Sequence, residues 1–262
     1  MNLIYQFYNG QIPYYARAGS KMMKAYADKI GADYTVDFNK TTIASSNSSY
    51  HNCFRPVFDA SLDKYDKILF CDMDVFPVKD IEEDIFDQQI DKFGIVEEKH
   101  QPEIRYADNN NPISGKNDER WSNIVKSYYG IKLPRDNQNR LRVFNSGVVL
   151  YTREGINLAR SHWIPISQYE SAVASLHRFY HLDQNYLGAM LGQNTFTVMD
   201  SKWNSQIHFI GDKNKKPRDI FDSRTQQTNF VHIQLRGRDK LDDDRIYDIV
   251  NKPISEWRHE RV

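Results

Sequence analysis

Short apolar runs alternate with amphipathic segments along the first part of the chain, and this alternation constrains the fold more than any other feature. Residues 3–8 are rich in aliphatic and aromatic side chains and end at Asn9-Gly10, which predicts a buried strand and a turn. Four further segments follow: a helix over 15–26, a strand over 34–36, a helix over 54–62 and the clearest strand over 67–71. Because parallel strands need helical crossovers, we expect an α/β fold with a mixed, mainly parallel sheet flanked by helices.

The second half of the chain continues this pattern around one polar stretch. Residues 99–120 are nearly all polar, and we expect an inserted polar loop region over 99–141. Asn145-Ser146-Gly147 interrupts two apolar runs and is expected to form a turn between them. Later helices are expected over 154–160 and 182–191, and later strands over 196–199, 207–210 and 229–233.

The composition excludes several classes of protein. The 35 Lys+Arg residues balance 35 Asp+Glu residues, so no cationic surplus indicates a nucleic-acid partner. Cys53 and Cys71 cannot build a disulfide framework and form no Cys-x-x-Cys pair, which favours a reducing compartment. The N-terminus lacks a basic signal region, and no apolar run approaches the ~20 residues of a membrane helix. We therefore expect cytoplasmic localisation without stable membrane insertion.

Two carboxylates follow the clearest predicted strand. Asp72 and Asp74 lie where open α/β sheets bind ligands, at the carboxyl end of a strand. Residues i and i+2 of an extended segment point to the same side, so both carboxylates can face one ligand. Two ionised carboxylates at close range repel each other, and this is unfavourable in free energy unless a cation or hydrogen-bond donors satisfy them. Their hard oxygen atoms suit Mg²⁺ or Mn²⁺. A solvated turn at the strand end is the alternative.

Three other kinds of site use the same acids. An EF-hand loop starting at Asp72 places Glu83 at its twelfth position, but an apolar residue and a proline replace a ligand and the required glycine. A sugar-nucleotide pyrophosphorylase needs a glycine-rich loop, which residues 9–13 do not supply. A phosphatase of the haloacid dehalogenase type stays open, with Asp242-Asp243-Asp244 as its later acidic motif, although these acids follow no buried strand.

Four segments occur in the order that one enzyme family shows. They are Ile68–Val75 with its Asp-Met-Asp, Val143–Leu150 with its Asn-Ser-Gly, Leu182–Asn185 and Phe230–His232. Together they resemble the motifs of GT-A-fold, DxD-type glycosyltransferases, and the pattern is similar to the glycogenin and bacterial lipopolysaccharide galactosyltransferase group. The resemblance implies a Rossmann-like GT-A fold, a nucleotide-diphosphate sugar as donor, and a divalent metal, usually Mn²⁺ with Mg²⁺ as the alternative.

The resemblance also implies how one domain over 1–262 is organised. Residues 1–98 form the half that binds the nucleotide sugar, the acceptor lies over 99–141, and residues 142–262 complete the acceptor and metal sites. The expected reaction moves a hexose-type sugar, typically from UDP, to a hydroxyl of a glycan or other acceptor with retention. The residues alone leave an inverting reaction open. A module that binds sugar nucleotides or glycans without catalysis is a further alternative.

Residue by residue, the resemblance makes Asp74 and His232 direct metal ligands and Asp72 a contact of both the metal and the donor ribose. An imidazole added to carboxylates favours Mn²⁺ over Mg²⁺. A lone histidine after a short strand is otherwise structural, so His232 gains its meaning from Asp72 and Asp74.

Two further motifs are expected around the donor and acceptor. In the family, Asn145, Ser146 and Gly147 lie under the donor sugar, where glycine permits close approach and asparagine pairs with hydroxyls. Asp183 and Gln184 are expected at the acceptor or donor-sugar hydroxyls and beneath the anomeric carbon. A helix N-cap is the alternative role of Asp183.

Cations are expected at the diphosphate and an aromatic residue at the base. The candidates for the diphosphate are Arg55, Arg236, Arg238 and Lys240, and Arg238 occupies the place where the family has a lysine after the metal histidine. Tyr8 and Asn9 end the first predicted strand and are expected near the base. Tyr8 is equally well explained as a core residue.

Overall fold

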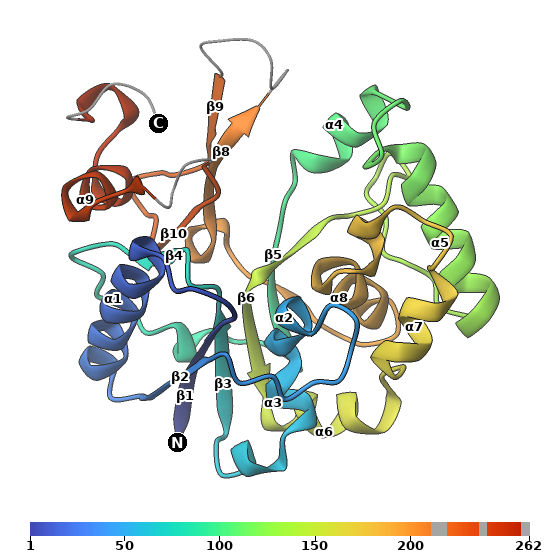
Figure 1. Cartoon of the computed structure of the whole chain (residues 1–262), viewed down its shortest axis with the longest axis horizontal. Helices are drawn as coiled ribbons and strands as arrows, with labels where there is room; N and C mark the ends of the chain where they lie inside the picture. The colour runs from blue at the N-terminus through green and yellow to red at the C-terminus, as the bar shows by residue number, and fades with distance from the viewer. Residues whose placement is uncertain (211–218, 236–239, 258–262) are drawn as a thin grey trace. The chain divides into compact units, whose positions relative to one another are not determined.

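The computed structural model describes residues 1–210, 219–235 and 240–257. The chain forms two compact units, each built from separate stretches of sequence (Figure 1). The first unit contains Met1–Lys40, Tyr65–Gln89 and Asp200–Val262, and the second contains Thr41–Lys64 and Ile90–Met199.

Three parallel strands form the centre of the first unit. Strand β1 (Asn2–Tyr8) pairs in parallel with β2 (Asp33–Phe38) on one side and β3 (Lys67–Cys71) on the other. Helix α1 (Tyr14–Ile30) connects β1 to β2 and ends at Gly31, whose φ of 70° is the left-handed conformation that a glycine C-cap adopts. The strand–helix–strand order predicted from the sequence is confirmed here.

A second sheet of the first unit has the order β4-β10-β8-β9. Its strands are β4 (Val75–Pro77), β8 (Ser205–Ile210), β9 (Asp219–Asp222) and β10 (Phe230–Ile233). Strand β10 runs antiparallel to β4 and parallel to β8. Helix α9 (Asp243–Asn251) packs on this sheet through Ile246 and Ile249, in one core with Phe76 and Val231. The sequence patterns predicted β8 and β10 and missed β4 and β9, which are short.

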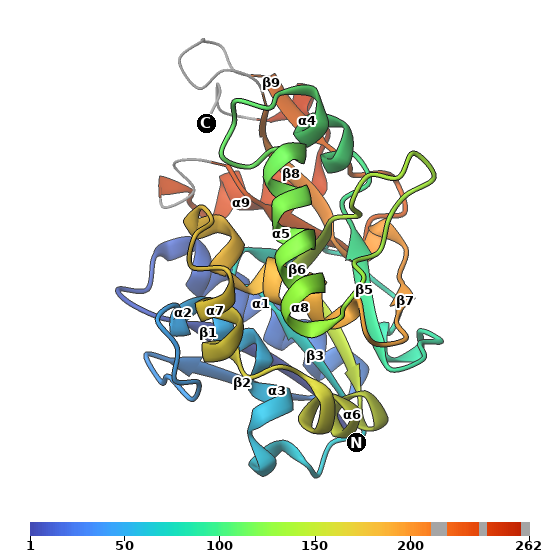
Figure 2. The same ribbon diagram turned by 90° about the vertical axis from the view of Figure 1, so that its right-hand side faces the viewer.

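The second unit has its own three strands, with β5 (Phe93–Glu97) in the middle. Strand β5 is antiparallel to β6 (Phe144–Thr152) and parallel to β7 (Thr197–Val198). The helices of this unit are α2 (Ser48–His51), α3 (Arg55–Phe58), α4 (Gln101–Ala107), α5 (Gly115–Tyr129), α6 (Arg153–His162), α7 (Ile166–Ala172) and α8 (Asp183–Leu191), and Figure 2 looks onto α5. Short 3-10 helices occur in both units. Those of the second unit are Asn52–Phe54, Ala60–Leu62 and Arg178–His181, and those of the first are Ile85–Asp87, Ser201–Trp203 and Ile254–Glu256.

Two predicted segments have a different conformation. The region 99–141, expected to be an inserted polar loop, contains α4 and α5 instead. Helix α5 buries Trp121 and Val125 as a narrow apolar stripe, which its many polar residues mask in the sequence. The helix expected over 54–62 is broken into short pieces around α3, which has a proline within its first two positions.

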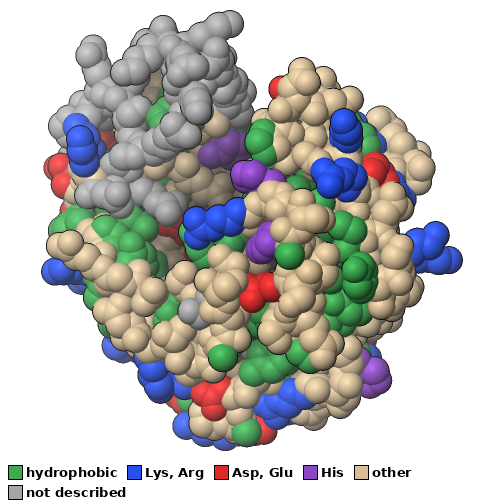
Figure 3. Space-filling view, turned by 45° about the vertical axis from the view of Figure 1, so that its right-hand side comes forward, with side chains coloured by type: hydrophobic (Ala, Val, Ile, Leu, Met, Phe, Trp, Pro, Cys, Tyr) green, Lys and Arg blue, Asp and Glu red, His purple; other side chains and the backbone are tan. Residues whose placement is uncertain are grey.

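The expected fold class is confirmed: helices flank mixed, mainly parallel strands. The division of one domain into 1–98, 99–141 and 142–262 stays a prediction. On the face drawn in Figure 3, charged side chains of both signs are interspersed among the described residues, as the balanced charge predicts. None of the helices in the described part of the chain is long and apolar enough to cross a membrane.

Candidate functional site

The segment Asp72-Met73-Asp74 connects β3 directly to β4. The backbone N–H of Val75 donates to the carbonyl of Asp72 (3.1 Å), which closes the turn between the two strands. Met73 is buried in the core of the first unit. Asp74 is 8% exposed, and Asp72 is half-buried. The apolar residue thus anchors the segment between the two acids.

Strand pairing places His232 beside Asp74. His232 stands opposite Val75 in the antiparallel pair of β10 and β4, and the N–H of Ile233 donates to the carbonyl of Asp74 (2.9 Å). The Nε2 atom of His232 lies 3.2 Å from Oδ1 of Asp74. One ligand atom from each of Asp72, Asp74 and His232 lies within 4.8 Å of the others. The structure therefore brings together the three residues that the sequence proposed for a metal.

The chemistry of this donor set fits a divalent cation. Asp72 and Asp74 are acceptor groups when ionised, and His232 offers a nitrogen through Nε2. The Nδ1 atom of the imidazole lies 3.1 Å from the amide oxygen of Asn204, an arrangement typical of metal-binding histidines. Two carboxylates and one imidazole suit Mn²⁺, and three protein ligands leave coordination positions for substrate oxygens.

Residues from three elements hold the main chain of this segment. The buried amide of Gln6 on β1 donates to the carbonyl of Asp72 (3.0 Å) and accepts from the hydroxyl of Tyr34 on β2 (2.8 Å). Tyr34 also contacts Ser20 of α1 (2.7 Å). At Gly19 of α1, an added Cβ would lie 2.3 Å from the carbonyl oxygen of Met73, so glycine is required for this close approach.

In the second unit, Asn145, Ser146 and Gly147 lie inside β6 and form no hairpin turn, so that expectation is wrong. Ile95 pairs with Val149 and the next residue of β5 pairs with Asn145, which makes this segment a bulge in the strand. The bulge is closed by the side chain of Asn145, which accepts from the N–H of Gly147 (2.8 Å). The same side chain donates to Glu98 (2.6 Å).

Asp183 lies in the first turn of α8, and Leu182 is the N-cap residue. The hydroxyl of Ser146 donates to Asp183 (2.5 Å), which joins two of the predicted motifs in one cluster. Burial raises the pKa of Asp183, and hydrogen bonds from Ser146 and the helix backbone oppose this change. Gln184 follows in the same turn and is half-buried.

The remaining predicted site residues occupy separate places. Tyr8 is half-buried against the core of the first unit, and Asn9 is exposed beyond the end of β1. Arg55 is buried in the second unit, where its Nε donates to Asp59 (2.8 Å). Lys240 is exposed in the first unit.

Burial opposes ionisation of Asp59, but hydrogen bonds from Ser61 and Arg55 prevail and lower its pKa to about 2. Arg55 is therefore held by a fully ionised partner at neutral pH. Arg236 and Arg238, the other arginines predicted at the diphosphate, lie outside the described residues.

Sequence reasoning missed the polar residues that support these clusters. Gln6 is a single amide within an apolar strand pattern, and that interruption was a usable signal. Asn204 and Glu98 carry no comparable local signal, because their partners His232 and Asn145 are distant in sequence.

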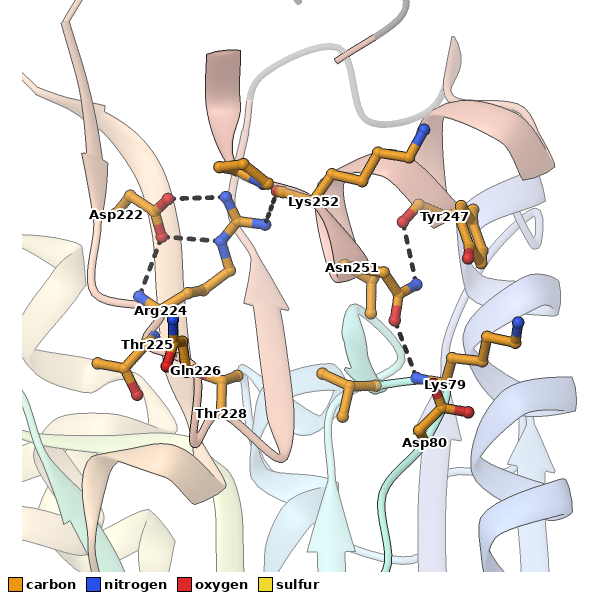
Figure 4. A pocket seen from close by; sticks show the side chains of 13 residues that line it. Lys79, Asp80, Asp222, Arg224, Thr225, Gln226, Thr228, Tyr247, Asn251 and Lys252 are labelled. Carbon is orange, nitrogen blue, oxygen red and sulfur yellow. Dashed lines mark hydrogen bonds and ion pairs between the residues drawn. The ribbon is translucent and has the colours of Figure 1, made fainter. Parts of the chain in front are cut away.

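A cavity of about 670 Å³ also lies within the first unit, beside the connection between β9 and β10 and the end of α9 (Figure 4). In its wall, Arg224 forms an ion pair with Asp222 (2.7 Å) and donates to the carbonyl of Lys252 (2.9 Å). Asn251 accepts from the N–H of Lys79 (2.9 Å). These contacts link the end of α9 to the segments that contain Arg224 and Lys79, so they stabilise the fold.

No family model and no curated protein sequence match this chain. Solved structures similar to it include the apo form of the bifunctional glycosyltransferase WbbM, with a TM-score of 0.49, 14% identity and coverage of 78% of this chain and 39% of that one. A glycosyltransferase involved in glycosylation of the major capsid of PBCV-1 has a TM-score of 0.42 and 13% identity, with coverage of 88% and 91%. An active-site mutant of LgtC has a TM-score of 0.44 and 12% identity, with coverage of 89% and 87%.

WbbM and the PBCV-1 protein are glycosyltransferases. The chain spans about two-fifths of the length of WbbM. At 12–14% identity, the likeness concerns the fold.

Proposed function

We propose that this chain is a metal-dependent glycosyltransferase, which moves a hexose-type sugar from a nucleotide-diphosphate donor such as a UDP-sugar to a hydroxyl of a glycan or other acceptor. The cluster of Asp72, Asp74 and His232 carries the proposal, because its ligand atoms converge within 4.8 Å. Bound there, Mn²⁺ would neutralise the negative charge of the diphosphate leaving group, with Mg²⁺ as the alternative. A cytoplasmic site of action is part of this proposal.

The other predicted residues are proposed to handle the two sugars. Asn145, Ser146 and Gly147 would contact the donor sugar, while Asp183 and Gln184 would orient the reacting hydroxyls. The hydrogen bond from Ser146 fixes one carboxylate oxygen of Asp183. In a retaining reaction, departure of the leaving group precedes attack on the same face, so the acceptor hydroxyl needs no strong protein base.

The remaining predicted residues are proposed to bind the nucleotide. Tyr8 and Asn9 would contact the base, and Arg55, Arg238 and Lys240 would contact the diphosphate.

The acids that the haloacid dehalogenase alternative takes as its second motif begin helix α9. Asp242 is the N-cap of α9 and accepts from the N–H of Arg245 (2.9 Å), and Asp243 and Asp244 lie in the first turn of that helix. Negative charge at a helix N-terminus stabilises the helix, so these acids have a structural explanation.

The proposal is tested by titration calorimetry and donor hydrolysis over a panel of nucleotide sugars, with Mn²⁺ and with EDTA. We expect selective binding that requires Mn²⁺, disappears in Asp74→Ala and persists in Asp28→Ala, which removes a surface carboxylate of α1. Cleavage of phosphate esters without nucleotide-sugar binding would instead favour the phosphatase. Donor binding with no turnover under any acceptor would favour the non-catalytic module.

A further inference from the structure

Asn204 is in direct contact with the histidine of the proposed metal site. Its Oδ1 atom lies 3.1 Å from Nδ1 of His232, and each residue is 2% exposed. An amide oxygen only accepts hydrogen bonds, so the imidazole must carry its proton on Nδ1 to satisfy this contact. A neutral imidazole protonated on Nδ1 has its free electron pair on Nε2. That nitrogen is the one 3.2 Å from Asp74.

A second amide agrees with this assignment. The Nε2 atom of Gln234 lies 3.3 Å from Nε2 of His232. An amide nitrogen donates, so it requires an imidazole nitrogen without a proton. The two amides therefore favour the same tautomer of His232.

The backbone around Asn204 is fixed by aromatic packing and by a helix cap. Asn204 follows the 3-10 helix Ser201–Trp203, and its N–H donates to the carbonyl of Ser201 (3.0 Å). Trp203 is fully buried and meets Phe230 edge to face, with ring centroids 5.2 Å apart. Asn204 is the residue after Trp203, and His232 is two residues after Phe230. Packing of the two rings therefore fixes the relative positions of Asn204 and His232.

We propose that Asn204 is a positioning residue that accepts the Nδ1 proton of His232 and so presents Nε2 to the divalent metal. The inference rests on the metal site of the proposed function and adds a residue that determines its affinity. Outer partners of metal-binding histidines fix the tautomer and ring orientation, and their loss lowers metal affinity by about 10–100-fold.

The first test needs neither a variant nor a metal. The carbon and nitrogen chemical shifts of the His232 ring in the metal-free protein report which nitrogen is protonated, and His232→Gln identifies the signals. We expect the proton on Nδ1. A ring that carries its only proton on Nε2 would overturn the assignment of Asn204 as acceptor.

The second test measures Mn²⁺ affinity by titration calorimetry in Asn204→Ala, Asn204→Asp and the control Asn229→Ala. Asn229 is a buried amide of the same unit that donates to Glu83 (3.2 Å). We expect affinity to fall by about 10–100-fold in Asn204→Ala and to persist or increase in Asn204→Asp, because a carboxylate also accepts. The control should change affinity by less than about twofold, since outer partners exert their effect through a ligand.

Equal affinities in Asn204→Ala and Asn229→Ala would contradict the proposal. So would a loss in Asn204→Asp as large as in Asn204→Ala, because the amide would then act as a donor. If Asn204→Ala does not fold, Asn204→Asp and the ring shifts decide the question. If the wild-type protein binds no divalent metal, the proposed function fails, while the ring shifts still test the role of Asn204.

Discussion

The two polar clusters of this protein satisfy their carboxylates in different ways. In the first unit, Asp72 and Asp74 converge with an imidazole, and all three offer ligand atoms. In the second unit, each acid has a neutral donor beside it: Asn145 donates to Glu98 and Ser146 donates to Asp183. The first arrangement suits a cation, whereas the second holds polar side chains in fixed orientations, which is compatible with the neutral, hydroxyl-rich ligand proposed above.

The contrast shows that a buried acid alone does not indicate a metal. Burial raises the pKa of Asp183, and the hydroxyl of Ser146 partly offsets that change. What distinguishes the first cluster is the gathering of three ligand atoms, two from the β3–β4 connection and one from β10.

The largest expected effect is on Mn²⁺ binding when single acids of the two clusters are neutralised in turn. Asp74→Asn should weaken binding by more than the ~10–100-fold that loss of an outer partner costs. Asp183→Asn and Glu98→Gln should leave the affinity within about threefold, since neither belongs to the ligand set. Titration calorimetry on the three variants provides the comparison. A comparable loss in either variant of the second unit would mean that the two clusters do not differ as described.

Much of the first cluster could be predicted from the sequence, because its signals are local. Asp72 and Asp74 directly follow a strongly apolar strand, and the pattern around His232 predicts a short strand. The pairing of β10 with β4, which brings them together, could not be predicted, because β4 has only three residues and no alternating pattern. Asn204 was missed because its partner His232 is distant in sequence, whereas Gln6 interrupts an apolar strand pattern and carried a local signal.

The second cluster was predicted with the wrong backbone. An Asn-Ser-Gly sequence is typical of a tight turn, but here it lies within one long strand as a bulge. Its polar residues are satisfied by Glu98 and Asp183, which come from distant parts of the sequence. Tertiary contacts therefore overrode the local turn preference.

An intermediate effect is expected from Gly19→Ala, which should displace the main chain of the first cluster. The added Cβ would lie 2.3 Å from the carbonyl oxygen of Met73, and this overlap with backbone should cost about 1–3 kcal/mol of unfolding free energy. Mn²⁺ affinity should fall as well, because Met73 lies between the two acids. Urea unfolding and metal titration check the two effects.

Gly31→Ala is the matched control for that variant. It adds a Cβ at the end of the same helix, where nothing lies within 4 Å but φ is 70°. Strain should destabilise the protein by about 1 kcal/mol without changing Mn²⁺ affinity. Equal losses of affinity in both variants would show that the effect of Gly19→Ala is general destabilisation.

The smallest expected effect concerns the pH dependence of the second cluster. Burial raises the pKa of Asp183 above its value of 3.8 in the unfolded chain. With respect to Asp183, the folded protein is therefore most stable below pH 3.8, where this residue is protonated in both states. It loses stability as the pH rises from 3.8 through the folded pKa, because ionised Asp183 is less favourable in the folded protein than in the unfolded chain. Asp183→Asn should therefore gain stability relative to wild type between pH 4 and pH 7, by less than the loss expected for Gly19→Ala. Urea unfolding at both pH values measures the difference, and a relative loss at pH 7 would contradict the assigned direction.

The most direct test of the central claim is the anomalous diffraction of crystals soaked in Mn²⁺ without nucleotide. We expect an anomalous peak at coordinating distance from the carboxylates of Asp72 and Asp74 and from Nε2 of His232. Crystals of Asp74→Ala soaked in the same way should lack this peak. A peak at Glu98 and Asp183 instead, or no peak at the first cluster of the wild-type protein, would contradict the account.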